Sequence, residues 1–71
     1  MTYNYDYSKL LGRMREKLIT QSHLASVLGL SETSLNRKIK NKTEFRQSEI
    51  SKICECLEIP NEHIDSYFFN H

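Results

Sequence analysis

Residues 20–42 read TQSHLASVLGLSETSLNRKIKNK, and this stretch decides which fold the sequence predicts. Its aliphatic residues recur at helical spacing on both sides of one glycine, which is typical of two amphipathic helices joined by a tight turn. We expect these helices to cover 20–28 and 32–40. Gly29 is expected to adopt the left-handed conformation that ends the first of them.

Side chains at the helix ends and at the crossing point fit the same arrangement. Thr20 and Ser31 stand where a hydroxyl can accept hydrogen bonds from the free N–H groups of a first turn. Ala25 is small enough to let the two helices approach closely, and Leu30 is placed to fill the angle between them. The stretch therefore predicts two crossed helices, the second of which turns its polar side outward.

The segment before this stretch predicts another helix, over about 7–18. Its apolar residues recur at three- and four-residue steps and are expected on the buried face: Tyr7, Leu10, Leu11, Met14 and Leu18. Asp6 is expected to cap this helix, because a carboxylate can accept from the free N–H groups of the first turn. Gly12 weakens a helix by up to about 1 kcal/mol relative to alanine, and we expect a close packing contact to explain its presence.

Two further helices are expected towards the C-terminus, over about 47–57 and, following Pro60, over about 61–66. No segment alternates polar and apolar residues for long enough to be a strand. The sequence therefore predicts an all-α fold, a compact bundle of four to five short helices that forms a single domain over 1–71. A chain of this length buries little apolar surface, so its stability must come from close helix packing or from a partner.

The stretch 20–42 resembles the helix-turn-helix of the lambda-repressor-like family. It has a capped helix that starts with glutamine, an alanine in mid-helix, a glycine turn, a hydrophobic residue, then serine and a second helix. With the flanking helices the resemblance covers nearly the whole chain, which is also similar in length and organisation to small phage switch proteins of the Cro-like and modulator-of-repression types. The resemblance implies a phage-encoded transcriptional regulator that acts in the bacterial cytoplasm, in the switch between lysis and lysogeny.

In this family the second helix of the motif lies in the DNA major groove, with its N-terminal residues at the base edges. Carried over by position, base reading falls to Glu32, Thr33, Asn36 and Arg37. Contacts to the phosphates of double-stranded operator DNA would come from Gln21, Lys38, Lys40, Lys42 and Arg46. The lysines can equally form an ordinary solvated face, and Glu32 can simply stabilise the helix N-terminus through the helix dipole.

Charge is small in total yet unevenly placed along the chain. The net charge is +1 and the isoelectric point is near 7.8, below the value of about 9 above which a domain is typically nucleic-acid-binding. Residues 33–48 contain five basic residues and one acidic residue, a net charge of +4. Residues 49–71 contain one basic and five acidic residues, a net charge of −4.

This asymmetry supports an alternative function, an antirepressor that binds a cognate phage repressor. An acidic surface could occupy the repressor's basic DNA-reading surface and compete with DNA phosphates for it. The alternative assigns the partner surface to acidic and aromatic residues near the C-terminus: Glu55, Glu58, Glu62, Tyr67, Phe68 and Phe69. The sequence leaves both functions open, and either one is compatible with a homodimer.

Several other function classes are not expected. Cys54 and Cys56 lie two residues apart in a predicted helix, so their side chains diverge and cannot form an unstrained disulfide. The histidines show no metal-ligand spacing, and no nucleophile–base pairing or phosphate loop indicates an enzyme. No apolar run approaches the roughly 20 residues that span a bilayer. We therefore expect no catalysis, no cofactor, no small-molecule ligand and no membrane partner.

Overall fold

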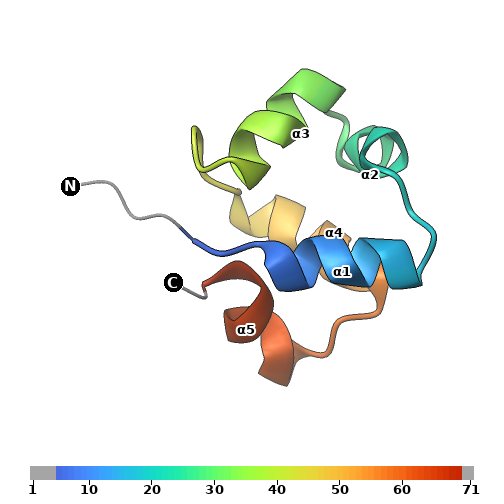
Figure 1. Ribbon diagram of the computed structural model, residues 1–71, viewed down its shortest axis with the longest axis vertical. Helices are drawn as coiled ribbons and strands as arrows, with labels where there is room; N and C mark the ends of the chain where they lie inside the picture. The colour runs from blue at the N-terminus through green and yellow to red at the C-terminus, as the bar shows by residue number, and fades with distance from the viewer. Residues whose placement is uncertain (1–4, 70–71) are drawn as a thin grey trace.

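Five α-helices and one short 3-10 helix account for most of residues 5–69, the part of the chain that the computed structural model describes (Figure 1). The helices are α1 (Ser8–Glu16), α2 (Gln21–Leu28), α3 (Glu32–Ile39), α4 (Gln47–Leu57) and α5 (Ile64–Phe68), with the 3-10 helix η1 (Asn61–His63) directly before α5. No strand occurs within residues 5–69, so the expected all-α class is confirmed. None of the helices in this range is long and apolar enough to cross a membrane.

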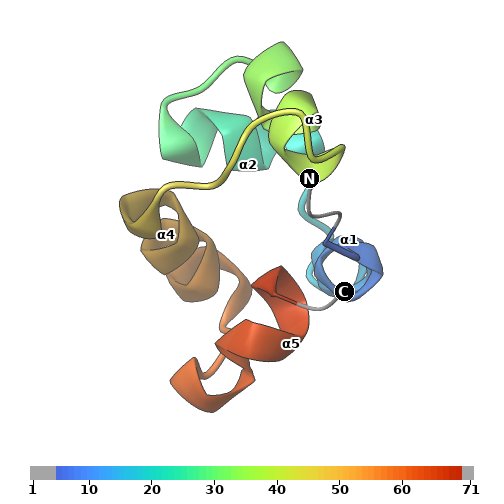
Figure 2. The same cartoon turned by 90° about the vertical axis from the view of Figure 1, so that its left-hand side faces the viewer.

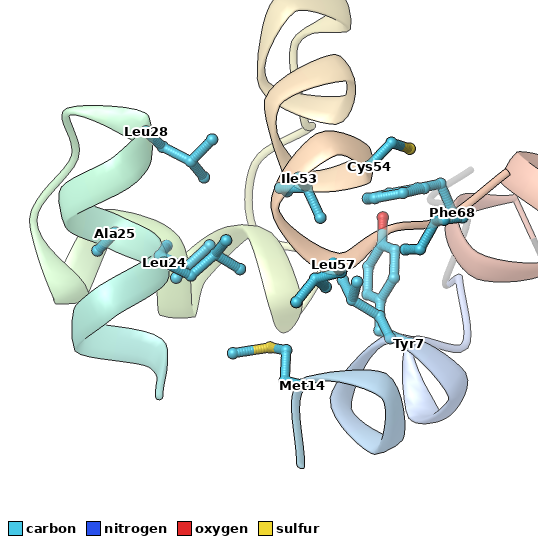
Figure 3. Close-up of a cluster of buried hydrophobic side chains, with 12 residues drawn as sticks. Tyr7, Met14, Leu24, Ala25, Leu28, Ile53, Cys54, Leu57 and Phe68 are labelled. Atoms are coloured by element: carbon cyan, nitrogen blue, oxygen red, sulfur yellow. The ribbon is translucent and has the colours of Figure 1, made fainter. Parts of the chain in front are cut away.

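The helices surround one hydrophobic core. Helices α2 and α3 form one end of the molecule, α5 forms the other, and α1 and α4 lie on opposite sides between them (Figures 1 and 2). Every α-helix contributes at least one fully buried side chain: Leu10, Leu24, Leu35, Ile53, Leu57 and Phe68. Burying one such side chain stabilises the fold by roughly 1.5–3 kcal/mol. Figure 3 shows how labelled members of this core from four of the helices converge.

The stretch 20–42 folds as its sequence predicts. The Thr20 hydroxyl accepts from the His23 backbone N–H at 3.1 Å, and the Ser31 hydroxyl accepts from the Ser34 N–H at 3.1 Å. Gly29 has a φ of 71° and ends α2. Because two capped helix starts and one left-handed turn are local features, the order of residues in this stretch is enough to specify them.

The end of α1 differs from the expectation. The helix was expected to continue to Leu18 but ends at Glu16, because Leu18 itself adopts a left-handed φ of 58°. The Ile19 N–H then donates to the Met14 carbonyl at 2.9 Å and closes the helix end. Leu18 is consequently 90% exposed, and its expected place on the buried face was wrong.

Three smaller expectations about helix ends and glycine also need correction. The N-cap position of α1 is held by Tyr7, although the Asp6 carboxylate does accept from the Ser8 N–H at 2.9 Å. The last helical segment is divided into η1 and α5 and continues to Phe68, past the expected end at residue 66. No atom lies within 4 Å of the place where a side chain on Gly12 would begin, so no close packing contact explains this glycine.

A buried ion pair joins α3 to α4. The Lys38 ammonium lies 3.1 Å from the Glu49 carboxylate and donates to the Glu44 carbonyl at 2.8 Å. Glu49 also accepts from the Arg46 N–H at 2.8 Å, at the start of α4. Both side chains of the ion pair are only 10% exposed. Burial alone would raise the pKa of Glu49, but these hydrogen bonds and the nearby positive charges outweigh burial, so the pKa lies below its usual value.

The side-chain amide of Asn41 attaches the chain before α1 to the turn after α3. Asn41 accepts from the Tyr5 backbone N–H at 2.9 Å through its side-chain oxygen. Its side-chain NH₂ donates to the Tyr5 carbonyl at 3.0 Å. The Asn41 side chain therefore pairs with the backbone of Tyr5 in both directions, as a neighbouring strand would.

The two glycines give a matched pair of stability predictions. We expect Gly12→Ala to raise the free energy of unfolding by about 0.5–1 kcal/mol, because alanine is the better helix former and has free space there. The same substitution at Gly29 should lower it by roughly 1 kcal/mol or more, because a Cβ is strained at positive φ. Urea denaturation of the two variants measures both effects, and a less stable Gly12→Ala variant would contradict the described environment.

The buried ion pair gives a pH-dependent prediction. Because the pKa of Glu49 is lowered on folding, its contribution to stability is present above the unfolded-state pKa of about 4.5 and is lost as the pH falls through the folded-state value. At neutral pH, Glu49→Gln should lower the free energy of unfolding by about 1–3 kcal/mol, because it leaves Lys38 buried without a counter-charge.

Urea denaturation across the acidic range checks this prediction. The difference between wild type and Glu49→Gln should shrink as the pH falls, because protonation removes the wild-type charge as well. Glu44→Gln is the matched control, since its exposed carboxylate should change stability by less than about 0.5 kcal/mol. A difference that persists unchanged in acid would rule out the pair as its source.

Candidate functional site

The four residues expected to read bases lie on one side of α3. Glu32, Thr33 and Arg37 are exposed, whereas Asn36 is half-buried. Their spacing of one, four and five residues puts them on one helix face, while Leu35 points into the core. The structure therefore brings these residues together, and Glu32 places a carboxylate at the start of that face.

The residues expected to contact phosphate differ in exposure and lie on separate elements. Lys40, Lys42 and Arg46 are exposed around the turn between α3 and α4, and Gln21 is half-buried at the start of α2. The expected phosphate contact of Lys38 needs correction, because its ammonium is buried against Glu49 and bonded to a backbone carbonyl. Its charge is neutralised inside the fold, so it is not available to a phosphate.

An open groove of about 480 Å³ runs between α3 and the start of α4. Residues of both charges line it: Leu30, Ser34, Arg37, Lys38, Thr43, Glu44, Arg46 and Glu49. The Lys38–Glu49 pair is neutral as a unit, which leaves the Glu44 carboxylate beside Arg37 and Arg46. This mixed lining differs from the uniformly positive groove that follows a nucleic-acid backbone.

The acidic residues assigned to a partner surface lie near the end of α4 and in η1. Glu55, Glu58 and Glu62 are all exposed. Glu58 is held in place, because its carboxylate lies 2.6 Å from the Lys17 ammonium and this hydrogen bond lowers its pKa. Glu55 and Glu62 have no ion-pair or hydrogen-bond partner among residues 5–69, so their charges are open to a partner.

The aromatic residues at the C-terminus divide between core and surface. Phe68 is 1% exposed and stacks edge-on against Phe45 at a centroid distance of 5.6 Å. Its assignment to a partner surface was wrong, because it fills the space between α1 and α4. Tyr67 is half-buried, and Phe69 is 45% exposed with its ring edge-on to Tyr5 at 5.8 Å.

Leu18 is an exposed apolar residue that the sequence pattern did not identify. It follows Met14 at the four-residue spacing of a buried face, and no glycine or proline near it signals the end of the helix. Only the observed backbone shows that the helix stops first.

The two cysteines differ in burial, with Cys54 in the core and Cys56 half-buried. Both are free thiols. Cys54 is buried in the core, and burial raises the pKa of its thiol, which keeps it protonated. Within residues 5–69, no group of three or more histidine, cysteine or acidic side chains is placed to hold a metal ion.

Comparison with known proteins places the chain in a family. Over residues 1–71 it matches the family described as "Protein of unknown function (DUF739)". It is also similar to the solution structure of the modulator of repression of the temperate bacteriophage TP901-1 from Lactococcus lactis. The two are 42% identical, the match covers 93% of this chain and 89% of the other, and the TM-score is 0.77. A comparison with curated proteins gave no match.

Neither of these two matches is described as a lambda-repressor-like protein, so membership of that family is not confirmed. The match along the whole length supports a different assignment: the chain belongs to the DUF739 family.

Proposed function

We propose that this chain is a phage antirepressor, which binds the repressor protein of its own phage and prevents that repressor from binding its operator. The observation that carries the proposal is the 42% identity, over 93% of the chain, to a protein named a modulator of repression. A phage protein of this kind acts in the decision between lysis and lysogeny. The proposed action is stoichiometric binding and includes no catalytic step.

The distribution of charge supplies a physical mechanism. A repressor must present a positive surface to DNA, because binding depends largely on contacts with phosphates. The unpaired carboxylates of Glu55 and Glu62 offer negative charge in the same region as the exposed Glu58. A protein surface of this sign attracts the repressor's DNA-binding surface over several ångströms and competes with the operator for it.

Operator binding of the Cro type is the second candidate function. It is favoured by the exposed face of α3, where Arg37 has no ion-pair partner within residues 5–69, and by the nearby exposed Lys40 and Lys42. Two observations weaken it. The Glu32 carboxylate at the start of that face would repel DNA phosphates, and the Lys38 ammonium is buried against Glu49.

The first test mixes the purified chain with the repressor of the same phage and a labelled operator fragment. We expect the chain to release the repressor from DNA and to co-elute with it in gel filtration. The chain alone should leave the operator unshifted at low salt, where phosphate contacts are strongest. Arg37→Ala should then leave release unchanged. A mobility shift by the chain alone that Arg37→Ala abolishes would support the Cro type instead.

A second test reverses charge at the acidic end. The double variant Glu55→Lys with Glu62→Lys should slow association with the repressor by about tenfold at low salt, because electrostatic steering is lost. In stopped-flow measurements, the association rates of wild type and the double variant should converge as the salt concentration rises, because the charges are screened.

The matched control for the charge reversal is Glu32→Lys with Glu44→Lys. It makes the same change in net charge at two exposed carboxylates beside α3. We expect it to leave the association rate almost unaltered. Equal slowing by both double variants would show that only total charge matters and would remove the acidic end as the docking surface.

A further inference from the structure

Leu18 combines two unfavourable features, an exposed apolar side chain and a left-handed backbone. Its side chain is 90% exposed, more than that of any other large hydrophobic residue within residues 5–69. Its backbone is in the left-handed region, with a φ of 58°, which a branched side chain adopts at a cost. Glycine or asparagine would end the helix at this position without either penalty. A role outside the isolated chain would explain the leucine.

The backbone that carries Leu18 is fixed from both sides. On one side, the Arg13 guanidinium donates to the Leu57 carbonyl at 2.9 Å and to the Glu58 carbonyl at 3.0 Å. On the same side, the Lys17 ammonium binds the Glu58 carboxylate at 2.6 Å. On the other side, Ile19 packs against the core directly after the exposed leucine. Leu18 therefore projects from a rigid support, which reduces the entropy that binding would cost.

These contacts hold the C-terminal ends of α1 and α4 side by side (Figure 1). Glu58 ends α4 with a left-handed φ of 55°, so two strained non-glycine residues, Leu18 and Glu58, are joined through Lys17. Residues in strained backbone conformations tend to gather at functional sites. We use the term docking end for the ends of α1 and α4 with the start of η1: Leu18, Glu55, Glu58 and Glu62.

We propose that Leu18 is the apolar anchor with which this chain docks on the phage repressor, with the carboxylates of the docking end contacting basic residues around it. The proposal rests on the proposed antirepressor function and adds the surface that performs it. A central hydrophobic side chain within a charged rim is the usual anatomy of a protein interface.

Charge favours a repressor over DNA or a second copy of this chain as the partner of the docking end. DNA is negative, as are the free carboxylates of Glu55 and Glu62, so these two side chains repel it. A second copy of this chain, placed against the same end by a two-fold axis, would bring the two acidic rims together. The basic DNA-reading surface of a repressor complements the free carboxylates of the docking end. Arg15 at the end of α1, Lys52 one turn before Glu55, and Lys17, which pairs with Glu58, offset part of the docking end's charge.

The test compares Leu18→Asn with wild type. Asparagine adopts the left-handed conformation more readily than leucine, so the helical circular dichroism should be retained and the Tm should be equal or higher. The affinity for the purified repressor of the same phage, measured by calorimetry, should fall at least about tenfold. Leu18→Met, which keeps an apolar side chain, should retain most of the affinity. Val27→Asn, the matched control at an exposed apolar residue of α2, should bind as wild type does.

The outcomes distinguish failure of the Leu18 anchor from failure of the proposed antirepressor function. If wild type does not bind the repressor, the antirepressor function fails and the anchor fails with it. If wild type binds and Leu18→Asn binds equally well, only the anchor is overturned. Sedimentation of the chain alone tests whether the docking end binds a second copy of the chain instead. A dimer that Leu18→Asn converts to monomer, with repressor affinity unchanged, would assign Leu18 to self-association and overturn the proposal.

Discussion

The ion pair between Lys38 and Glu49 determines how α3 is held and how much of its charge reaches the surface. Lys38 sits in the last turn of α3 and Glu49 in the first turn of α4, so this contact joins the two helices directly. Taking both charges out of water is costly unless each is fully bonded. Here the Glu44 carbonyl gives the Lys38 ammonium a second partner, and the Arg46 N–H gives the Glu49 carboxylate a second partner. The face of α3 that resembles a DNA-reading helix therefore has one cation fewer than its sequence suggests.

The helices of this chain depend on one another. None exceeds eleven residues, and isolated helices of such length are marginal in water. Each of the five α-helices contributes at least one fully buried side chain to the shared core, from Leu10 in α1 to Phe68 in α5. The core therefore holds short elements whose ends are closed by caps and left-handed turns, and it leaves few apolar residues for the surface. Leu18 is conspicuous because the rest of the chain uses its large aliphatic side chains so sparingly outside the core.

Features specified by neighbouring residues were predictable from the sequence, and those that depend on distant contacts were not. The caps at Thr20 and Ser31 and the turn at Gly29 were predicted, since each needs only a residue type beside a helical pattern. The burial of Lys38 was not, because its partner lies eleven positions away on another helix. The exposure of Leu18 was missed for a different reason: its left-handed backbone ends α1 early, and a leucine carries no signal for such an end.

The pairing of Asn41 with the backbone of Tyr5 makes one attachment sensitive to chemical ageing. A side-chain amide can both donate and accept, and this site uses both abilities. Hydrolysis of the amide would turn Asn41 into an aspartate, which keeps the acceptor and loses the donor. The new carboxylate would then face the Tyr5 carbonyl, oxygen against oxygen. Exchange of one NH₂ group for an oxygen would thus replace a two-way link between the chain before α1 and the turn after α3 with a repulsive contact.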